Sequence, residues 1–361
     1  MVPIQIHQCN FASIPFGHAH CDRRPAGTQW RIPSLEHLMA DRHVLILGAA
    51  GRLGRELTVA FARNGWRTRA HLRGETPPEW ADLPQISTVR ADALDTPALS
   101  RAAAGCSVVV NALNAPYHRW HDAALPLARS AQAAARQNGA LMILPGNVYN
   151  FGCEMPARLT PETPEVGNTP KAQLRIRMEA ELADDAGLDS VVLRAGDFFG
   201  GAGRGSWFDL AIASRLAAGK VVYPGDPSLP HAWAYLPDLA ASFVALAEQR
   251  AELSGHRRLH FPGHGVSGEE MRQALSEASG RNLKLAGMPW PLLRLAAPFV
   301  PSLKAVVEMR YLWQRAHTLD GSALAARIGA VPATPLVLAL KQSLAALGLQ
   351  ASLPVAGSLV I

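Results

Sequence analysis

Short apolar runs alternate with segments of helical periodicity over most of the chain. The run "HVLILG" (43–48) is apolar throughout, and a glycine-rich turn and a helix over 52–64 follow it. Five further runs with the character of strands lie at 67–73, 86–92, 106–113, 140–146 and 189–196. Longer helices are expected at 122–137 and 170–186. Apolar strands that alternate with helices indicate a parallel sheet with helices on both faces.

The pattern becomes looser after about residue 200. We expect helices at 206–218, 237–249, 267–279, 290–313 and 334–347, and strands at 220–224 and 257–262. This part, 201–350, is expected to form a smaller α/β lobe that binds the substrate, and part of the chain can return to the sheet. Residues 1–38 have no periodicity and are expected to be a poorly ordered extension, with 351–361 as a tail.

The most apolar stretch of the chain, 288–301, is interrupted by Pro289, Pro291, Arg294 and Pro298. A membrane-spanning helix needs about 18 apolar residues, so we interpret this stretch as a buried helical segment. No apolar run of the chain reaches that length, and we expect no membrane partner.

Composition and charge narrow the class of protein. The 361 residues are 48% apolar and 18% charged, which is ordinary for a globular protein, and the net charge of +6 is scattered. Since no run of five basic residues occurs, nucleic-acid binding is not expected. The four cysteines lie far apart without a CxxC pair, so neither a metal site nor disulfides are indicated. The N-terminus lacks a secretory pattern, and the expected compartment is a reducing cytoplasm.

A glycine-rich turn joins the first strand to the first helix. Its sequence "GAAGRLG" places Gly48, Gly51 and Gly54 at a GxxGxxG spacing. The first glycine permits a tight turn, the second lets the backbone approach a pyrophosphate, and the third lets the helix pack close to the strand. Because a helix N-terminus attracts anions, strand, turn and helix together predict a dinucleotide-binding site. The other residues of the turn expected at the cofactor are Ala50, Arg52 and Leu53.

The end of the second strand distinguishes NAD from NADP. An acidic residue there would bind the ribose 2′-hydroxyl of NAD, but "AHLRG" offers Arg73 instead. With Arg52 in the glycine turn, two guanidinium groups suit a 2′-phosphate, so NADP is expected and NAD is less favoured. The alternative is that both arginines are solvated. Further cofactor contacts are expected after the third and fourth strands, from Asp92, Ala93, Asn111 and Ala112.

Together these features resemble a known superfamily. The glycine motif, Asp92, the strand end "NAL", and the segments "VLRAGDFFG" (192–200) and "HAWAYLPDLA" (231–240) are similar to those of the extended or atypical short-chain dehydrogenase/reductases. The epimerase/dehydratase-like branch is the most similar. The resemblance covers about residues 41–347 and implies an α/β fold: a Rossmann-type doubly wound parallel sheet over 39–200, a smaller C-terminal α/β substrate lobe and a nicotinamide cofactor.

The catalytic signature of this superfamily is altered. Members usually carry Ser or Thr after the fifth strand and Tyr-x-x-x-Lys at the start of the next helix. Here "LPGNVYNFG" (144–152) places Pro145 at the serine position, and no tyrosine lies between Tyr149 and Tyr223. The usual Ser-Tyr-Lys triad is therefore absent, which argues against ordinary alcohol–ketone redox chemistry and sugar epimerisation.

The helix that normally supplies the tyrosine and lysine retains a lysine. Lys171, Ala172, Arg175 and Glu179 match a K-A-x-x-R-x-x-x-E pattern similar to the isoflavone-reductase-like branch, in which the lysine is thought to be the general acid/base. A cation in the first helical turn costs roughly 0.3–1 kcal/mol, and Arg175 adds a second positive charge. Both favour a neutral amine, which suits proton transfer. The alternatives are that Lys171 holds the nicotinamide ribose or is merely exposed.

Other residues are expected near the reacting centre. Tyr149, after the fifth strand, is a second candidate for proton transfer or packs beside the nicotinamide. Gly196, after the sixth strand, is expected to flank the carboxamide, and Asp197 follows it. The residues expected to line the substrate are Tyr117, Asn147, Phe198 and Trp233, although core packing explains Trp233 equally well.

The sequence thus predicts an NADP-dependent oxidoreductase of the atypical extended short-chain type, acting on a small carbonyl or enone. The alternatives are a nucleotide-sugar epimerase or dehydratase, and a non-enzymatic NADP-binding redox sensor. The expected partner is a small-molecule substrate. A homodimer through the helices at 122–137 and 170–186 is an arrangement that the superfamily often adopts.

Overall fold

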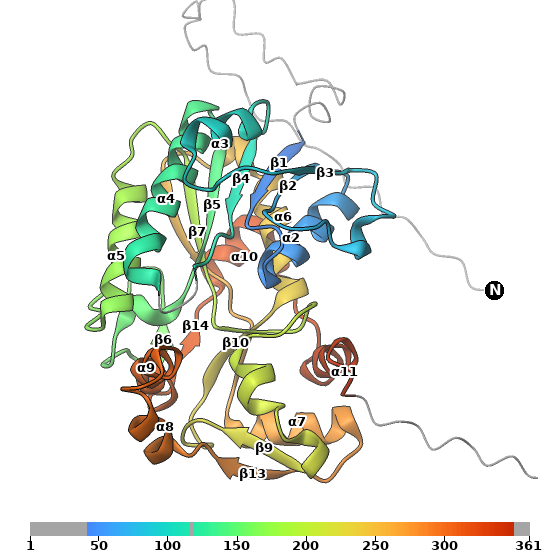
Figure 1. Ribbon diagram of the computed structural model, residues 1–361, viewed down its shortest axis with the longest axis vertical. Helices are drawn as coiled ribbons and strands as arrows, with labels where there is room; N and C mark the ends of the chain where they lie inside the picture. Colours follow the sequence, from blue (N-terminus) through green and yellow to red (C-terminus); the bar gives the residue numbers. More distant parts are fainter. Residues whose placement is uncertain (1–41, 116–118, 350–361) are drawn as a thin grey trace, which may run out of the picture.

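The computed structural model describes residues 42–115 and 119–349, with a seven-stranded parallel sheet at its centre (Figure 1). The strand order is β11-β7-β5-β4-β1-β2-β3, and every neighbouring pair is parallel. The order reverses between β1 and β4, the place where open α/β sheets bind ligands. The strands are β1 (His43–Leu47), β2 (Arg67–His71), β3 (Ile86–Val89), β4 (Val108–Asn111), β5 (Leu141–Gly146), β7 (Ser190–Arg194) and β11 (His256–His260).

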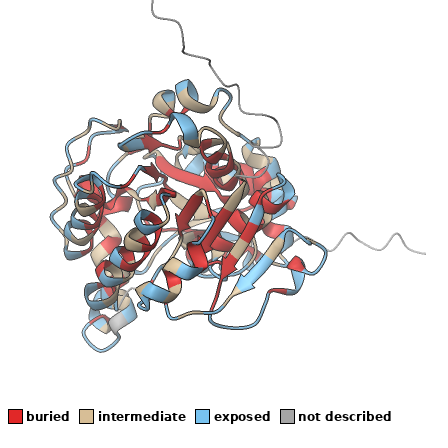
Figure 2. Ribbon diagram, turned by 90° about the horizontal axis from the view of Figure 1, so that it is seen from above, coloured by how far each residue is buried: buried red, intermediate tan, exposed pale blue. Residues whose placement is uncertain are grey.

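Both faces of the sheet are covered by helices, and the strands are buried between them (Figure 2). In β1, Val44 and Ile46 join the core on one face, whereas Leu45 and Leu47 join the core on the other. This confirms the doubly wound fold that the apolar runs predicted. The helices of the first face are α2 (Arg52–Arg63) and α6 (Leu236–Glu248), and those of the second are α3 (Thr96–Ala103), α4 (Trp120–Gln137) and α5 (Pro170–Ala183).

A smaller lobe is formed mainly by the chain after β7, and its core is rich in aromatic residues such as Phe199, Trp233 and Trp313. The chain leaves the lobe to form β11 at the edge of the main sheet and then enters it again. The lobe's strands pair as β12-β10-β8, β13-β9 and β14-β6: β6 (Arg158–Leu159), β8 (Asp197–Phe199), β9 (Lys220–Tyr223), β10 (His231–Tyr235), β12 (His264–Val266), β13 (Lys284–Gly287) and β14 (Thr318–Leu319). The remaining α-helices are α7 (Gly268–Ser279), α8 (Trp290–Ala296), α9 (Pro301–Glu308), α10 (Ser322–Ile328) and α11 (Leu336–Ala346).

The prediction of one regular helix over 206–218 is wrong. The chain instead forms a π-helical turn at Phe208–Ile212 and a short 3₁₀ helix at Leu216–Ala218. The Asp209 carboxylate accepts hydrogen bonds from the backbone N–H groups of Gly205 and Ser206, which stabilises an irregular turn where a regular helix was expected. The helix expected at 290–313 is also divided, into α8, α9 and the 3₁₀ helix Met309–Trp313, as the intervening prolines require.

The stretch 288–301 is only partly buried, since Trp290 and Ala297 are buried but its large aliphatic side chains and Phe299 are exposed, which corrects the interpretation drawn from its composition. Leu292 is 67% exposed, Leu295 is 73% exposed and Phe299 is 84% exposed. Helix α8 packs mainly on α9, and its buried Trp290 donates a hydrogen bond to the carbonyl of Pro224, whereas the side that carries Leu292 and Leu295 faces solvent. Apolar composition does not by itself show whether a segment is buried within its own chain or exposed as a contact surface.

Candidate functional site

The glycine turn lies where β1 meets the start of α2. Gly48 has φ +74°, and a Cβ there would lie 2.7 Å from the carbonyl oxygen of Ala112. A Cβ on Gly54 would lie 2.2 Å from the carbonyl oxygen of Gly48, so the helix packs against the turn with no space for a side chain. Gly51 is the N-cap of α2, Ala50 is exposed and Leu53 is buried in the sheet's core. The N-terminus of α2 is thus presented beside the ends of β1 and β4, a cradle that fits a pyrophosphate.

Arg52 ties this turn to the glycine-rich segment 200–206. Its Nη1 lies 2.5 Å from the carboxylate of Asp209, and its Nη2 donates a 2.9 Å hydrogen bond to the carbonyl of Gly200. Burial raises the pKa of Asp209, but hydrogen bonds from Ser206 and Gly205 together with Arg52 outweigh it and leave the pKa lowered. The Arg52 guanidinium is therefore engaged within the chain, and a contact with a 2′-phosphate would require it to leave Asp209.

The adenosine end of the expected site is more open. Arg73 is exposed two residues beyond His71, whose Nε2 lies 3.0 Å from the carbonyl oxygen of Ala91. Burial lowers the pKa of His71, with Arg73 lowering it further and Asp92 opposing, so both charges lie close to one imidazole. Asp92 is exposed and accepts a hydrogen bond from the Leu94 backbone N–H, while Ala93 beside it is buried.

The expected nicotinamide end lies at the carboxyl ends of β4 and β5. Asn111 is buried, its side chain accepts a hydrogen bond from Leu113, and the Ala112 N–H donates to the carbonyl of Leu47. Asn147 accepts a 3.0 Å hydrogen bond from the backbone N–H of Tyr149. Tyr149 is buried, and its ring centroid lies 6.2 Å from that of Trp120. A small cavity between β4, α4 and α5 is lined by Asn111, Trp120, Arg175 and Met178 among others. Tyr117 lies outside the described residues.

Lys171 occupies the first turn of α5, behind the N-cap Thr169, and is buried. Its Nζ forms an ion pair with Glu308, the last residue of α9, and the same carboxylate accepts a 3.3 Å hydrogen bond from the Lys171 backbone N–H. The sequence argument for a neutral Lys171 amine considered only positive charges near it. The structure adds a negative charge, the Glu308 carboxylate, which favours the protonated amine. No local pattern indicated Glu308, because it lies 137 residues further along the chain.

Gly167 precedes Lys171 by four residues, which is the tyrosine position of a Tyr-x-x-x-Lys motif. A Cβ at Gly167 would lie 2.4 Å from the Cβ of Ala172 and 3.1 Å from the carbonyl oxygen of Asn150. The backbone at this point therefore has no room for a tyrosine side chain. The missing tyrosine is thus accompanied by close packing of Gly167 against Ala172.

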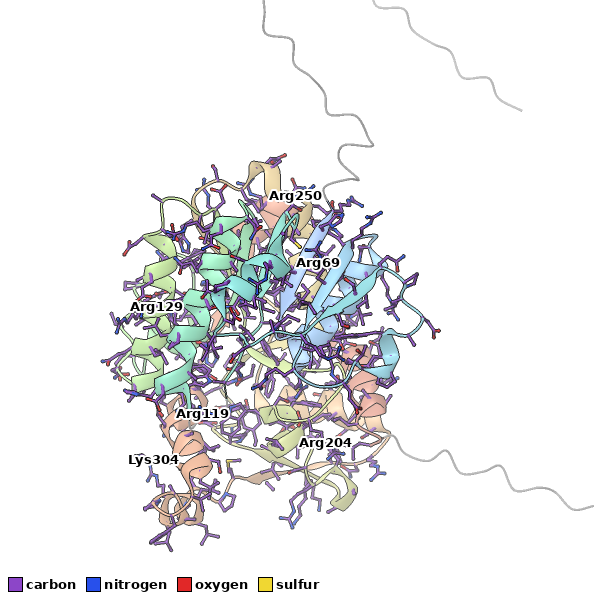
Figure 3. All side chains as sticks on the ribbon, turned by 45° about the horizontal axis from the view of Figure 1, so that its top comes forward. Arg69, Arg119, Arg129, Arg204, Arg250 and Lys304 are labelled. Carbon is purple, nitrogen blue, oxygen red and sulfur yellow. The ribbon has the colours of Figure 1, made fainter. Side chains whose placement is uncertain are left out.

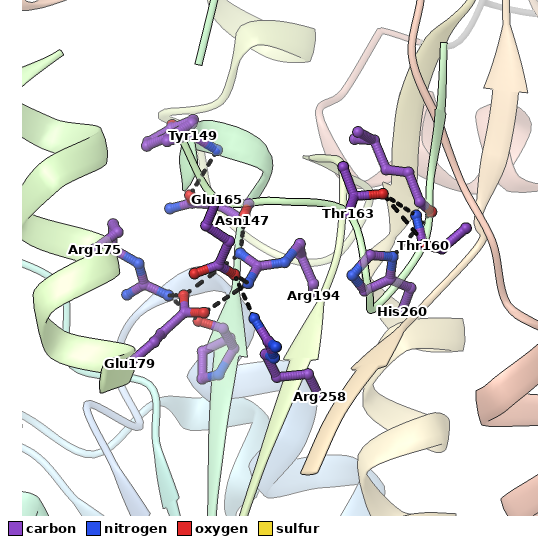
Figure 4. Close-up of polar contacts among 12 residues, drawn as sticks. Asn147, Tyr149, Thr160, Thr163, Glu165, Arg175, Glu179, Arg194, Arg258 and His260 are labelled. Atoms are coloured by element: carbon purple, nitrogen blue, oxygen red, sulfur yellow. Dashed lines mark hydrogen bonds and ion pairs between the residues drawn. The ribbon is translucent and has the colours of Figure 1, made fainter. Parts of the chain in front are cut away.

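The other two charged residues of the K-A-x-x-R-x-x-x-E pattern belong to a buried ion network (Figure 4). Arg175 donates to the carbonyl of Pro145 at 2.5 Å and lies 3.5 Å from Glu179. Glu179 pairs at 2.6 Å with Arg194 from β7. Desolvation by burial lowers the pKa of Arg175, and the negative charge of Glu179 opposes this change.

Arg194 is the centre of this network and is 1% exposed. It also pairs with Glu165 at 2.5 Å, donates to the backbone carbonyl of Asn147 and lies over the ring of Phe151. Burial and the Arg194 charge lower the pKa of His260 to about 4, so the neighbouring imidazole is neutral near pH 7. The network fixes the backbone that carries Asn147 and Tyr149. Sequence reasoning missed Arg194 and Glu165, although an arginine inside an apolar strand was a signal for a buried partner.

The smaller lobe approaches the sheet at Gly196, where a Cβ would lie 2.1 Å from the carbonyl oxygen of Ala232. Asp197 follows, and its carboxylate lies 2.7 Å from Nε2 of His231, whose ring stacks on Trp313 at 4.0 Å. Phe198 is half-buried. Trp233 is fully buried in the aromatic core of the lobe, so the alternative of core packing describes it better than a substrate contact.

Comparisons with known proteins agree with this arrangement. Residues 48–206 match the family model described as NAD(P)H-binding. A ceramide reductase of Caulobacter vibrioides (strain NA1000 / CB15N) is 27% identical over 275 residues, which cover 73% of this chain and 79% of that protein. Two solved structures have the same fold: a UDP-glucose-4-epimerase of Stenotrophomonas maltophila with bound NAD (TM-score 0.68, 18% identity, 84% of this chain and 96% of that one), and the Bordetella bronchiseptica enzyme WbmH with NAD+ (TM-score 0.66, 17% identity, 85% and 98%).

The fold and the glycine turn define an NAD(P)-binding protein of Rossmann type. It shares its fold with these NAD-bound structures, and its residues 48–206 match an NAD(P)H-binding model, which agrees with the resemblance found in the sequence.

The described residues offer neither a metal site nor a membrane-spanning helix. Over residues 42–115 and 119–349 there is no cluster of three or more His, Cys, Asp or Glu side chains placed to hold a metal ion. Within the same ranges, none of the helices has the length and apolar character needed to cross a membrane.

The Arg175–Glu179–Arg194 network generates a stability prediction. In Glu179→Gln the two buried guanidinium groups lose their shared carboxylate, so the free energy of unfolding should fall by roughly 3–5 kcal/mol. Glu181→Gln is the matched control, since Glu181 pairs with Arg129 and Arg177 on the outer side of the same helix and should cost about 1 kcal/mol or less. Urea unfolding measures both, and equal effects would contradict the buried role.

Proposed function

We propose that the protein is an NADP-dependent oxidoreductase acting on a carbonyl or enone with an apolar body. The observation that carries the proposal is the Lys171–Glu308 ion pair. It lies at the start of α5, beside the expected dinucleotide site, where the usual catalytic tyrosine is missing. When bound, the reduced nicotinamide supplies a hydride to the substrate carbon. The N-terminus of α2 would hold the pyrophosphate, and Arg73 would contact the 2′-phosphate.

In this proposal Lys171 moves the proton. As the substrate carbon accepts the hydride, the carbonyl electron pair passes to oxygen, which takes a proton from Nζ of Lys171. Glu308 orients that amine through the ion pair and supports its reprotonation. Tyr149 remains the second candidate donor, and the alternative for Lys171 is that it holds the nicotinamide ribose.

Two observations favour neighbouring functions. The relative named a ceramide reductase favours a reductase, with an amphipathic substrate in place of a small one. The fold shared with a UDP-glucose-4-epimerase favours a nucleotide-sugar epimerase or dehydratase, which the filled space at Gly167 makes less suitable. A sensor that binds NADP without turnover is the non-enzymatic alternative.

Oxidation of NADPH, followed at 340 nm against ketones, aldehydes, enones and UDP-sugars, tests the reaction class. We expect turnover with at least one apolar carbonyl or enone. Conversion of a UDP-sugar without net NADPH oxidation would replace the proposal with the epimerase. Tight NADP binding without turnover of any compound would replace it with the sensor.

Lys171→Ala tests the proton-transfer role. Removal of a general acid should lower kcat by roughly 10²–10⁴-fold while the Kd for NADP changes little. A ribose-binding role would instead raise the Kd with a smaller change in kcat. Lys341→Ala, on the exposed side of α11, is the matched control and should leave both values unchanged.

Arg73→Ala tests the cofactor choice. Loss of a charge-assisted contact to the 2′-phosphate should weaken NADP binding by roughly tenfold or more and leave NAD binding unchanged. Arg101→Ala, which removes an exposed arginine from α3, should change neither. Titration of both nucleotides by fluorescence gives the result, and equal losses for NAD and NADP would refute the assignment to the 2′-phosphate.

A further inference from the structure

Four neighbouring apolar side chains on the α8–α9 hairpin lie in contact with solvent. They are Leu292, Leu295, Phe299 and Val300, which we call the apolar patch. Leu292 and Leu295 are three residues apart and share one side of α8, and Phe299 follows four residues later. Exposed large apolar residues scattered singly are ordinary, whereas a contiguous group on a protruding element marks an interaction surface.

Up to Glu308, at the far end of α9, the charged residues of the hairpin are all basic. Residues 278–307 contain Arg281, Lys284, Arg294 and Lys304 and no acidic residue, because the flanking acids are Glu277 and Glu308. Arg294 and Lys304 are exposed beside the apolar patch, and Lys304 lies at the margin of the molecule in Figure 3. Apolar side chains surrounded by cations form the pattern of elements that lie in the interface of an anionic bilayer.

The patch is connected directly to the candidate site. Helix α9 begins at Pro301, next to the patch, and ends at Glu308, which holds Lys171. At about 1.5 Å per residue, its eight residues span about 12 Å. In Figure 1 the hairpin extends beyond α5 at the margin of the lobe. A surface bound to the patch would therefore lie close to the Lys171–Glu308 pair.

A second copy of this chain is a poor occupant of the patch. A two-fold interface would bring the same patch from both copies together, so Arg294 and Lys304 would face their own equivalents with no acid from 278–307 to compensate them. An anionic lipid surface accepts both the apolar side chains and the cations.

We propose that the α8–α9 hairpin docks this protein peripherally on anionic lipid bilayers. Leu292, Leu295 and Phe299 enter the interface while Arg294 and Lys304 contact lipid phosphates. Peripheral docking of this kind departs from the sequence expectation of no membrane partner, which considered only spanning segments. A docked hairpin places the site where an amphipathic carbonyl compound could reach it from the bilayer, and this last consequence rests on the proposed function.

Co-sedimentation of the full chain with vesicles tests the docking without cofactor or substrate, so its outcome is independent of the proposed reaction. We expect binding to vesicles of phosphatidylglycerol and phosphatidylethanolamine, weakened by salt, and much less binding to phosphatidylcholine alone. The double variant Leu295→Ser, Phe299→Ser should reduce the partition coefficient by roughly tenfold or more. Arg294→Gln with Lys304→Gln should reduce it on anionic vesicles only.

Leu338→Ser is the matched control, because Leu338 is an exposed leucine of α11, and it should bind as the unaltered protein does. Three outcomes would overturn the proposal: no sedimentation of the unaltered protein with anionic vesicles, equal sedimentation of the apolar double variant, or a dimer in solution that this variant dissociates. The last would assign the patch to a second copy.

Discussion

The buried contact between Arg194 and Glu179 is the interaction on which the site depends most. It joins the end of β7 to the middle of α5, and through Arg175 and the backbone carbonyl of Asn147 it also fixes the end of β5. A buried guanidinium is costly unless its donors are satisfied, so the network must form as a unit. Once formed, it determines where the loop carrying Tyr149 lies relative to Lys171.

Much of the fold was predictable because it rests on local patterns. The apolar runs of β1, β4, β5 and β7 and the glycine spacing at Gly48, Gly51 and Gly54 depend on neighbours in the sequence. The partner of Lys171 was not predictable, since Glu308 reaches it from another lobe. For the same reason Arg175 was read as a neighbour of Lys171, although its direct contacts are Pro145 and Glu179. The exposure of Phe299 was missed because composition alone does not tell buried from exposed apolar segments.

The Lys171–Glu308 pair changes how the two lobes relate to one another. The lysine stands on the nucleotide-binding sheet's helix α5, whereas the glutamate ends a helix of the smaller lobe. The Arg52–Asp209 pair makes a second connection of this kind, at the glycine turn. Each expected end of the cofactor site is therefore held partly by residues that come after position 200, and the site is a joint product of both parts of the chain.

The return of the chain to the main sheet has a consequence for how the protein can be divided. Strand β11 pairs with β7 at the sheet's edge, and α6 packs against α2 beneath the glycine turn. A fragment ending near residue 200 would keep the nucleotide-binding motif but expose Leu57 and Phe61, which share a core with Leu239 and Phe243 of α6. The nucleotide-binding unit is thus discontinuous in sequence, and a transplantable version of it would have to carry the segments of α6 and β11 along with its first 160 or so described residues.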